Sequence, residues 1–554
     1  MKITAIPQLY RNVNRWGEIL AVLSKYGLAD WLSRFRLDMT KGWLKDRAGA
    51  AIARRSRETR IRMALMELGP TFIKLGQILS TRPDLVGVEL AAELGLLQGD
   101  VDADPPAAVY ETIEQELGRP VDELFELFED TPMASASIGQ VHRARLKDGQ
   151  EVAVKVQHQA IEKKMRVDLD ILAGLAQMAE RVPEFANYRP QATVAEFQRT
   201  LRRELDFGRE ERNMQQFAKD FANEKSIKIP TALDDYSTSR VLTMELIDGI
   251  KLTDRRAMAA AGLDLQEVAR RGATLFLEMI FSHGWYHADP HPGNIVLLKG
   301  NAIGLLDFGM VGRIDESLRE DLERILAAIV SQDAEALSSL IMRIGEVPLN
   351  LDEPALRMDL ADFVVHFGNQ PLDAFDLSGA LGEMTEIIRR YHIMLPAQVA
   401  MLFKTLIMLE GTASAIYPHF SLMQVMRPFR RNMLRRQLSP ARRLRKLRKL
   451  AGDLEQLAEV LPRRVMDILT QVESGKFDVH LNHRGLEPSV NRLVLGMLTS
   501  ALFLGSSLLL AQKVWPVVFG KVSVLGAAGC LVSLFLGLRL LRAINKSGHL
   551  DRRE

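Results

Sequence analysis

Residues 287–294, with the sequence HADPHPGN, and the DFG at residues 307–309 decide which fold this chain adopts. Asp289 and Asn294 are five positions apart, and Asp307 follows Asp289 by 18 positions, behind an apolar run. Phosphoryl transfer of the protein-kinase type brings a base, two metal-ligating side chains and ATP to one point. We therefore predict that Asp289 orients or deprotonates the attacking hydroxyl or water, while Asn294 and Asp307 bind Mg²⁺.

Two other interpretations of residues 287–294 are open from the sequence. His287, Asp289 and His291 stand at alternate positions and could bind the metal of a hydrolase, or the two prolines could simply form a rigid turn. The sequence has no third cluster of histidines and acids, which argues against a hydrolase. The apolar residues directly before Asp307 are typical of a buried strand, which argues against a simple turn.

Residues 151–156, EVAVKV, alternate as a strand does and place Lys155 on the face opposite three valines. The small-residue segment upstream, joined to this strand through an Asp-Gly turn, predicts a hairpin whose backbone can approach phosphates. A second strand, at residues 240–247, would end at an interlobe hinge that could hold adenine. The residues expected to line the ATP site are Ala134, Ser135, Ala136, Ser137, Ile138, Gly139, Gln140, Val141, Lys155, Glu245 and Ile247.

A kinase lysine needs a carboxylate partner on a neighbouring helix. The helix expected over residues 192–222 lies between the two strands in sequence and carries several acids. We predict that Glu210 pairs with Lys155 and joins Asp289 and Lys155 as a catalytic residue, with Glu211 as the alternative partner.

The order of elements predicts an α+β, two-lobed protein-kinase-like fold, because helices come first, strands follow, and everything beyond residue 315 is helical. A helical extension would precede the lobes, and two transmembrane helices would follow them. The predicted domains are the extension at 1–100, the N-lobe at 101–250, the C-lobe at 251–425, a basic helical region at 426–490 and a transmembrane hairpin at 491–545.

The C-terminal region contains two uncharged apolar runs, 19 residues at 493–511 and 17 residues at 522–538. Runs of this length predict two membrane-spanning helices, and the excess of Lys and Arg outside the pair predicts that both ends face the cytoplasm. A buried apolar helical pair is the alternative. The N-terminus lacks a secretory signal, and the single cysteine, Cys530, excludes a disulfide within one chain.

The region just before these runs is basic, with eleven Lys or Arg and no acid in residues 427–449. Such a segment predicts contact with the anionic head groups of membrane lipids. Nucleic acid is the weaker alternative, because aromatic residues are almost absent among the basic ones. We therefore expect lipids and no nucleic acid as partners.

Six motifs in order resemble the UbiB family of atypical kinase-like proteins. They are KLGQ at 74–77, ASASIGQVH at 134–142, VAVKVQ at 152–157, ELD at 204–206, HADPHPGN at 287–294 and LLDFG at 305–309. The resemblance implies that Lys74 and Gln77 regulate the site from a helix folded over the nucleotide cleft, with Lys74 reaching Glu204 and Asp206. Peptide access would then be blocked, and no Ala-Pro-Glu platform for a peptide follows the DFG.

The resemblance also implies a function, namely use of ATP and Mg²⁺ in support of ubiquinone biosynthesis at the bacterial inner membrane. The kinase-like domain would be cytoplasmic and would act on, or give access to, polyprenyl phenol quinone precursors, with other quinone-biosynthesis proteins as partners. Two alternatives stay open at this point. One is a small-molecule kinase that phosphorylates a lipid, and the other is a nucleotide-sensing scaffold for biosynthetic enzymes.

Overall fold

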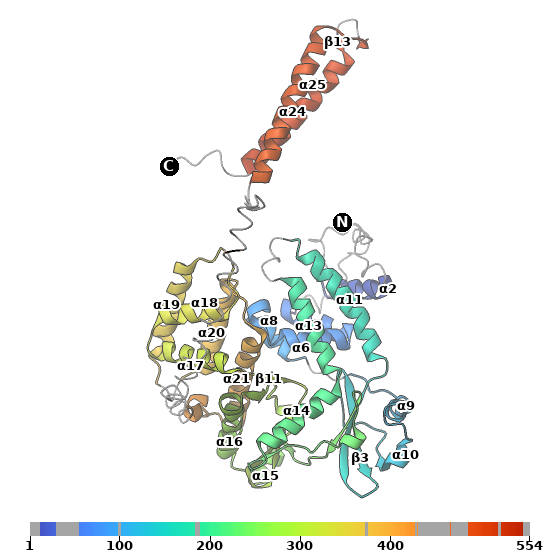
Figure 1. Cartoon of the computed structure of the whole chain (residues 1–554), viewed down its shortest axis with the longest axis vertical. Helices are drawn as coiled ribbons and strands as arrows, with labels where there is room; N and C mark the ends of the chain where they lie inside the picture. Colours follow the sequence, from blue (N-terminus) through green and yellow to red (C-terminus); the bar gives the residue numbers. More distant parts are fainter. Residues whose placement is uncertain are drawn as a thin grey trace. The chain divides into compact units, whose positions relative to one another are not determined.

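The computed structural model of the chain consists of two units, Met1–Ser439 and Pro440–Glu554. Figure 1 shows their helices and strands, coloured along the sequence. The structure describes residues 12–28, 55–97, 101–182, 189–348, 350–371, 375–426, 429, 466, 486–518 and 522–546. Most of the predicted basic region at 426–490, including all eleven basic residues at 427–449, lies outside the described residues.

An antiparallel sheet forms the first lobe, with β1 (Phe125–Phe128), β3 (Gly139–Leu146), β4 (Glu151–Gln157) and β6 (Val241–Glu245) in that order, and β2 (Ala134–Ser135) paired to β3. The predicted hairpin is confirmed, since β3 and β4 pair through a turn in which Gly149 has φ 87°. Three valines of β4 at positions 152, 154 and 156 are buried in one cluster. Lys155 therefore lies on the opposite face.

In the described part of the chain, α11 (Ile161–Ala179), α13 (Pro190–Glu204) and α14 (Phe207–Asp220) follow the hairpin before β6. The prediction of a single helix over residues 192–222 is wrong, because the helix is interrupted between α13 and α14. The cause is Asp206, whose side chain accepts the backbone N–H of Gly208 at 3.1 Å and caps α14. Because of this break, Glu204 lies at the end of α13 whereas Asp206 caps the start of α14, so the two carboxylates have different surroundings.

The N-terminal extension contains α2 (Val13–Lys25), α5 (Arg57–Leu68) and α6 (Pro70–Leu79). Gly69 has φ 94° and Pro70 follows it, so one helix ends and another begins there. The extension is attached to α11 through Asp168, whose buried carboxylate accepts hydrogen bonds from Arg15 at 2.7 Å and Thr71 at 2.6 Å.

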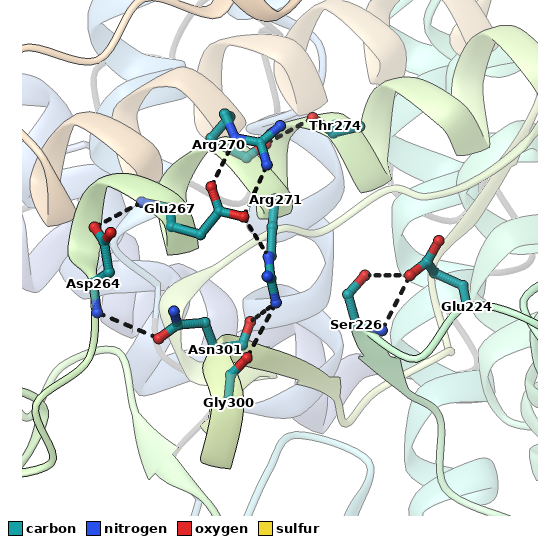
Figure 2. Close-up of polar contacts among 9 residues, drawn as sticks. All are labelled: Glu224, Ser226, Asp264, Glu267, Arg270, Arg271, Thr274, Gly300 and Asn301. Atoms are coloured by element: carbon teal, nitrogen blue, oxygen red, sulfur yellow. Dashed lines mark hydrogen bonds and ion pairs between the residues drawn. The ribbon is translucent and has the colours of Figure 1, made fainter.

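The second lobe contains α15 (Arg255–Ala260) and α16 (Leu265–Glu278), followed by β8 (Trp285–His287), β9 (Ile295–Leu298) and β10 (Ala302–Leu305). Figure 2 shows how α16 holds the turn between β9 and β10: the guanidinium of Arg271 donates to the carbonyl oxygens of Gly300 at 3.1 Å and Asn301 at 3.3 Å. Asn294 precedes this hairpin and Asp307 follows it, and the pairing of Ile295 with Leu305 brings these two ends together.

Helices complete the lobe, as the sequence predicts. They are α17 (Glu316–Val330), α18 (Ala334–Ile344), α19 (Glu353–Gly368), α20 (Leu377–Arg390) and α21 (Ala397–Ile416). By length and composition α21 could span a membrane, but just over half of it is buried among these helices. The unit therefore has the predicted α+β, two-lobed kinase-like fold with a helical extension.

The second unit contains the predicted pair of apolar helices, α24 (Leu486–Ala511) and α25 (Val524–Lys546). Both are long and apolar enough to cross a membrane, and their side chains are mostly exposed, unlike those of α21. The two helices pack closely where a Cβ on Gly529 would lie 2.1 Å from Ser506 Oγ. These helices suggest that the protein associates with a membrane.

Candidate active site

Lys155 on β4 forms an ion pair with Glu210 on α14. Its Nζ lies 3.0 Å from Oε1 and 2.7 Å from Oε2 of the glutamate, and 3.7 Å from Asp307 Oδ2. Glu211 instead faces Asp234, and burial together with that hydrogen bond raises the pKa of Glu211. The structure therefore brings together Lys155 and Glu210, and not the alternative pair.

Opposing effects act on the pKa values of this pair. Burial would lower the pKa of Lys155, but the carboxylates of Asp307 and Glu210 outweigh it and raise the pKa above its ordinary value. Burial raises the pKa of Glu210, against the attraction of the lysine. For Asp307, burial is outweighed by Lys155 and by the N–H of Gly309, and the pKa falls to about 2. The ammonium of Lys155 and the carboxylate of Asp307 are therefore both charged at neutral pH.

The DFG segment is fixed by its own backbone. Asp307 Oδ1 accepts the N–H of Gly309 at 2.8 Å, and the amide of Asn213 donates to the carbonyl of Phe308 at 3.0 Å. The ring of Phe308 is fully buried. Asn213 is a site residue that the sequence analysis missed, and it lies one turn after Glu210 on the same helix.

His287 connects the two halves of the site. Its Nδ1 accepts the N–H of Asp289 at 3.2 Å, so in the neutral ring Nε2 carries the proton and donates to the carbonyl of Asp307. Burial lowers the pKa of His287, which favours this neutral form. Asn294 Nδ2 donates to Asp289 Oδ2 at 2.9 Å, so the two functional residues of the loop are in contact.

The oxygen donors suit Mg²⁺, which prefers carboxylate and carbonyl oxygens and completes its shell with phosphates and water. Asp307 offers an ionised carboxylate, and Asn294 offers its amide oxygen. Among the described residues, no group of three or more His, Cys, Asp and Glu could hold a metal. His291 accepts the N–H of Gly293 at 3.1 Å and, like His287, holds the loop in shape. This geometry gives the hydrolase hypothesis no support.

Lys74 on α6 reaches the end of α13, where its Nζ lies 2.6 Å from Glu204 Oε2 with both side chains buried. The expected contact with Asp206 is wrong, because that carboxylate caps α14 and pairs with Arg212 at 3.3 Å. Gln77 donates to the carbonyl of Leu97 at 3.2 Å and holds the extension together. A regulatory role for these residues stays a prediction.

The predicted nucleotide loop is partly a strand. Ala134 and Ser135 form β2, and the turn closes where the N–H of Ala136 donates to the carbonyl of Gly139 at 2.9 Å. Ser137 and Ile138 are buried within the turn, and Val141 pairs with Ala134. A Cβ on Gly139 would lie 2.5 Å from the carbonyl oxygen of Val156, so glycine is needed there for strand pairing whatever the ligand.

Side chains near the proposed nucleotide also have partners within the fold. Gln140 lies 2.7 Å from His142 and accepts the N–H of Asp104 at 2.7 Å. The carboxylate of Glu245 pairs with Lys228 at 2.7 Å, and Ile247 packs near Gly304. These side chains are therefore already engaged within the protein, so ATP would contact mainly the backbone of these residues. Their contacts with ATP stay predictions.

Helix α21 braces the catalytic loop, which the sequence analysis did not foresee. Thr405 Oγ1 shares its proton between the carbonyls of Ala288 at 3.1 Å and Met401 at 2.8 Å, and Thr412 Oγ1 donates to the carbonyl of Pro290 at 3.1 Å. Lys404 lies beside the first of these threonines. The available signal was that Lys404 and Glu410 are the only charged residues in the 20-residue segment of α21.

The chain matches the ABC1 atypical kinase-like domain over residues 96–341, the UbiB helical domain over residues 360–421 and the ABC1/UbiB kinase-like C-terminal domain over residues 480–546. The first match contains Lys155, Glu210, Asp289, Asn294 and Asp307. The second contains Lys404 and both bracing threonines.

Curated relatives extend the similarity over most of the chain. A probable protein kinase UbiB from Xanthomonas axonopodis is 33% identical over 522 residues, covering 89% of this chain and 93% of that protein. One from Marinobacter nauticus is 36% identical, covering 76% and 78%. An uncharacterized protein from the hydrogenase 1 5′ region of Clostridium pasteurianum is 31% identical, covering 88% and 93%.

Among solved structures, a Mycobacterium tuberculosis protein in complex with erythromycin aligns with a TM-score of 0.45 and 23% identity, covering 58% of this chain and 82% of that one. The domain matches and the curated relatives agree with the site geometry and with the sequence motifs. The chain belongs to the ABC1/UbiB family of atypical kinase-like proteins.

Proposed function

We propose that this protein is a membrane-anchored, Mg²⁺-dependent atypical kinase or ATPase that supports ubiquinone biosynthesis. The observation that carries the proposal is the position of Lys155, whose ammonium lies 2.7 Å from Glu210 and 3.7 Å from the aspartate of the DFG. This arrangement allows one lysine to bind phosphate oxygens while an acid on α14 holds it in place.

Each residue of the loop has a role in this proposal. Asp289 receives the proton of the attacking water or hydroxyl, and Asn294 holds that carboxylate by its 2.9 Å hydrogen bond. Asp307 and Asn294 would hold Mg²⁺. When bound with ATP, the metal neutralises charge on the phosphates.

The acceptor is water or a lipid, and not a protein, in this proposal. The buried ion pair between Lys74 and Glu204 anchors the extension beside the site, which supports exclusion of peptides. The apolar helices α24 and α25 support access to membrane-bound molecules. Polyprenyl phenol precursors of ubiquinone are the proposed molecules, at a bacterial inner membrane with the kinase-like unit in the cytoplasm. Other quinone-biosynthesis proteins are the proposed protein partners.

ATP turnover by the full chain tests the activity. We expect phosphate release in vesicles of phosphatidylglycerol and phosphatidylethanolamine, increased by a short-chain polyprenyl phenol, and abolished by Asp307→Asn. The matched control is Asp235→Asn, which makes the same change at an exposed residue of the first lobe. Turnover that is equal in wild type and Asp307→Asn would contradict the proposal.

Product analysis separates the remaining alternatives. Mass spectrometry that finds a stable phosphorylated phenol would identify a lipid kinase, whereas phosphate release without such a product would identify an ATPase. A bacterial strain lacking its own protein of this family tests the pathway. We expect the wild-type chain, but not Asp307→Asn, to restore its quinone. Full restoration by an Asp289→Asn variant that binds ATP without turnover would identify a scaffold.

A further inference from the structure

The catalytic loop lacks a cation of its own. The residues between Asp289 and Asn294 are Pro, His, Pro and Gly, so no Lys or Arg of this loop can meet the charge on a transferred phosphoryl group. Lys155 on β4 is already shared between Glu210 and Asp307. Charge that develops on the phosphoryl oxygens needs a fixed donor to stabilise it.

Lys404 on α21 is in a position to supply this charge. Its neighbour Thr405 donates to the carbonyl of Ala288, the residue before the catalytic aspartate. Thr412, two turns further along the helix, donates to the carbonyl of Pro290, the residue after it. Two hydrogen bonds at 3.1 Å thus hold α21 against both sides of Asp289, and they keep the backbone of Lys404 next to the loop.

The side chain of Lys404 is partly buried and is not neutralised by an ion pair among the described residues. Its Nζ donates to Ser80 Oγ at 3.2 Å, at the end of the helix that carries Lys74. Within the described part of the chain, it forms no ion pair with a carboxylate within 4 Å. Burial lowers its pKa, and the field of Asp289 opposes that effect. An ammonium that is desolvated and held by one neutral hydroxyl gains much from an anionic ligand.

The charges of Lys404 and Lys74 affect one another because both side chains lie near the two aspartates of the site. Burial lowers the pKa of Lys74 to about 8, opposed by the carboxylates of Asp307 and Asp289, while Lys155 and Lys404 lower it further. The three lysines and two aspartates are therefore electrostatically close. Lys155 and Lys74 are each paired with a glutamate, so Lys404 is the lysine of this group whose charge is left to meet the terminal phosphate of a nucleoside triphosphate.

We propose that Lys404 is a phosphate-contacting residue, which the C-terminal helical region supplies to the transferred phosphoryl group. This inference rests on the proposed function. In the step, the bond from the terminal phosphorus to the bridging oxygen of the β-phosphate breaks, and a bond to the oxygen of water or a hydroxyl forms. Asp289 takes the proton of that oxygen, and the diphosphate leaves with the bridging electron pair. Lys404 transfers no proton and stabilises charge on the non-bridging oxygens.

The competing explanation is that Lys404 only tethers the extension through Ser80. Three variants of the full chain in lipid vesicles separate the two explanations. Lys404→Gln removes the charge but keeps a polar side chain, Lys404→Arg keeps the charge, and Ser80→Ala removes the tether together with the hydrogen bond from Ser80 Oγ to the carbonyl of Gln77. We expect Lys404→Gln to lower kcat about 100-fold, as loss of one transition-state donor does, with little change in ATP affinity. Lys404→Arg should recover part of the loss, and Ser80→Ala should keep kcat within about threefold of wild type.

Binding of a transition-state mimic provides a readout that a tether would not affect. We expect Lys404→Gln to bind ADP as wild type does but to bind ADP with aluminium fluoride and Mg²⁺ at least tenfold more weakly. Equal losses of kcat in Lys404→Gln and Ser80→Ala, or equal binding of the mimic by wild type and Lys404→Gln, would overturn the inference. These results leave the proposed function intact as long as Asp307→Asn still abolishes turnover. An inactive wild-type chain would instead contradict the proposed function.

Discussion

The ammonium of Lys155 lies 2.7 Å from Glu210, although Glu211 is the next residue and carries the same group. The phase of α14 explains the choice. Glu210, Met214 and Phe217 are spaced four and three residues apart and are all buried on one side of the helix, whereas Glu211 is turned toward Asp234. Position on the helix, and not chemical type, therefore selects the partner of the lysine.

This relationship predicts different effects for two matched variants. Glu210→Gln removes a charge-assisted contact, which is worth about 1.5–3 kcal/mol, so we expect kcat/KM for ATP to fall about 10- to 100-fold. Glu211→Gln should change it less than about threefold. Steady-state ATP turnover of both variants checks the prediction. Similar losses in the two variants would mean that the ion pair in the structure is not the one used in turnover.

The sequence was sufficient for residues whose positions depend on local patterns. Strand alternation places Lys155, and the spacing of residues 287–309 places Asp289, Asn294 and Asp307 on a loop and hairpin that bring them together. The break between α13 and α14 was not foreseen, because an aspartate within a polar stretch can cap a helix or lie on its surface. Only the folded chain shows which of these occurs.

The position of Lys404 near the site could not be predicted from the sequence for a different reason. It lies more than one hundred residues after Asp289, and only the packing of α21 brings the two segments together. An isolated lysine in an apolar helix indicates a buried polar interaction, but it does not identify the partner. Tertiary contacts such as those of Thr405 and Thr412 supply that information.

Glu204 and Asp206 should behave differently despite being two residues apart. Glu204→Gln leaves the buried ammonium of Lys74 without its partner, and breaking a buried pair costs about 3–5 kcal/mol. Asp206→Ala removes a helix cap, which costs about 0.5–2 kcal/mol. Chemical denaturation of the full chain in detergent, followed by tryptophan fluorescence, measures both. A larger loss of stability for Asp206→Ala than for Glu204→Gln would contradict the assignment of Glu204 as the partner of Lys74.

His142 makes the first lobe sensitive to acid. Its Nδ1 is 2.7 Å from the carbonyl of Glu129 and its Nε2 is 2.7 Å from the side-chain nitrogen of Gln140, which fixes a neutral ring protonated at Nδ1. Burial lowers the pKa of His142 below 6.5, opposed by the hydrogen bond to Glu129. Below pH 6.5 the imidazole of His142 therefore binds a proton more readily in the unfolded chain than in the folded one. The free energy of unfolding must then decrease as the pH is lowered.

We expect the unfolding temperature of the wild-type chain to decrease between pH 7 and pH 5. His142→Asn, which does not titrate in this range, should be less stable at pH 7 but should lose less on acidification. Differential scanning fluorimetry at matched ionic strength measures both slopes. Identical slopes for the two proteins would exclude His142 as the titrating group, and the wild-type slope would then come from the other histidines.

The packing of α24 against α25 can be tested through the single cysteine of the chain. Ser507 Oγ lies 3.9 Å from Cys530 Sγ across the two helices. A cysteine at position 507 would bring two sulfur atoms near bonding distance, so we expect Ser507→Cys to form an intramolecular disulfide with Cys530 under a membrane-permeant oxidant. Gly505→Cys is the matched control, because a Cβ there meets no atom within 4 Å. Non-reducing electrophoresis after protease cleavage between the helices reads out the bond. Equal cross-linking of both variants would indicate that the helices slide past one another, whereas a cross-linked dimer would indicate that Cys530 faces a second copy of the chain.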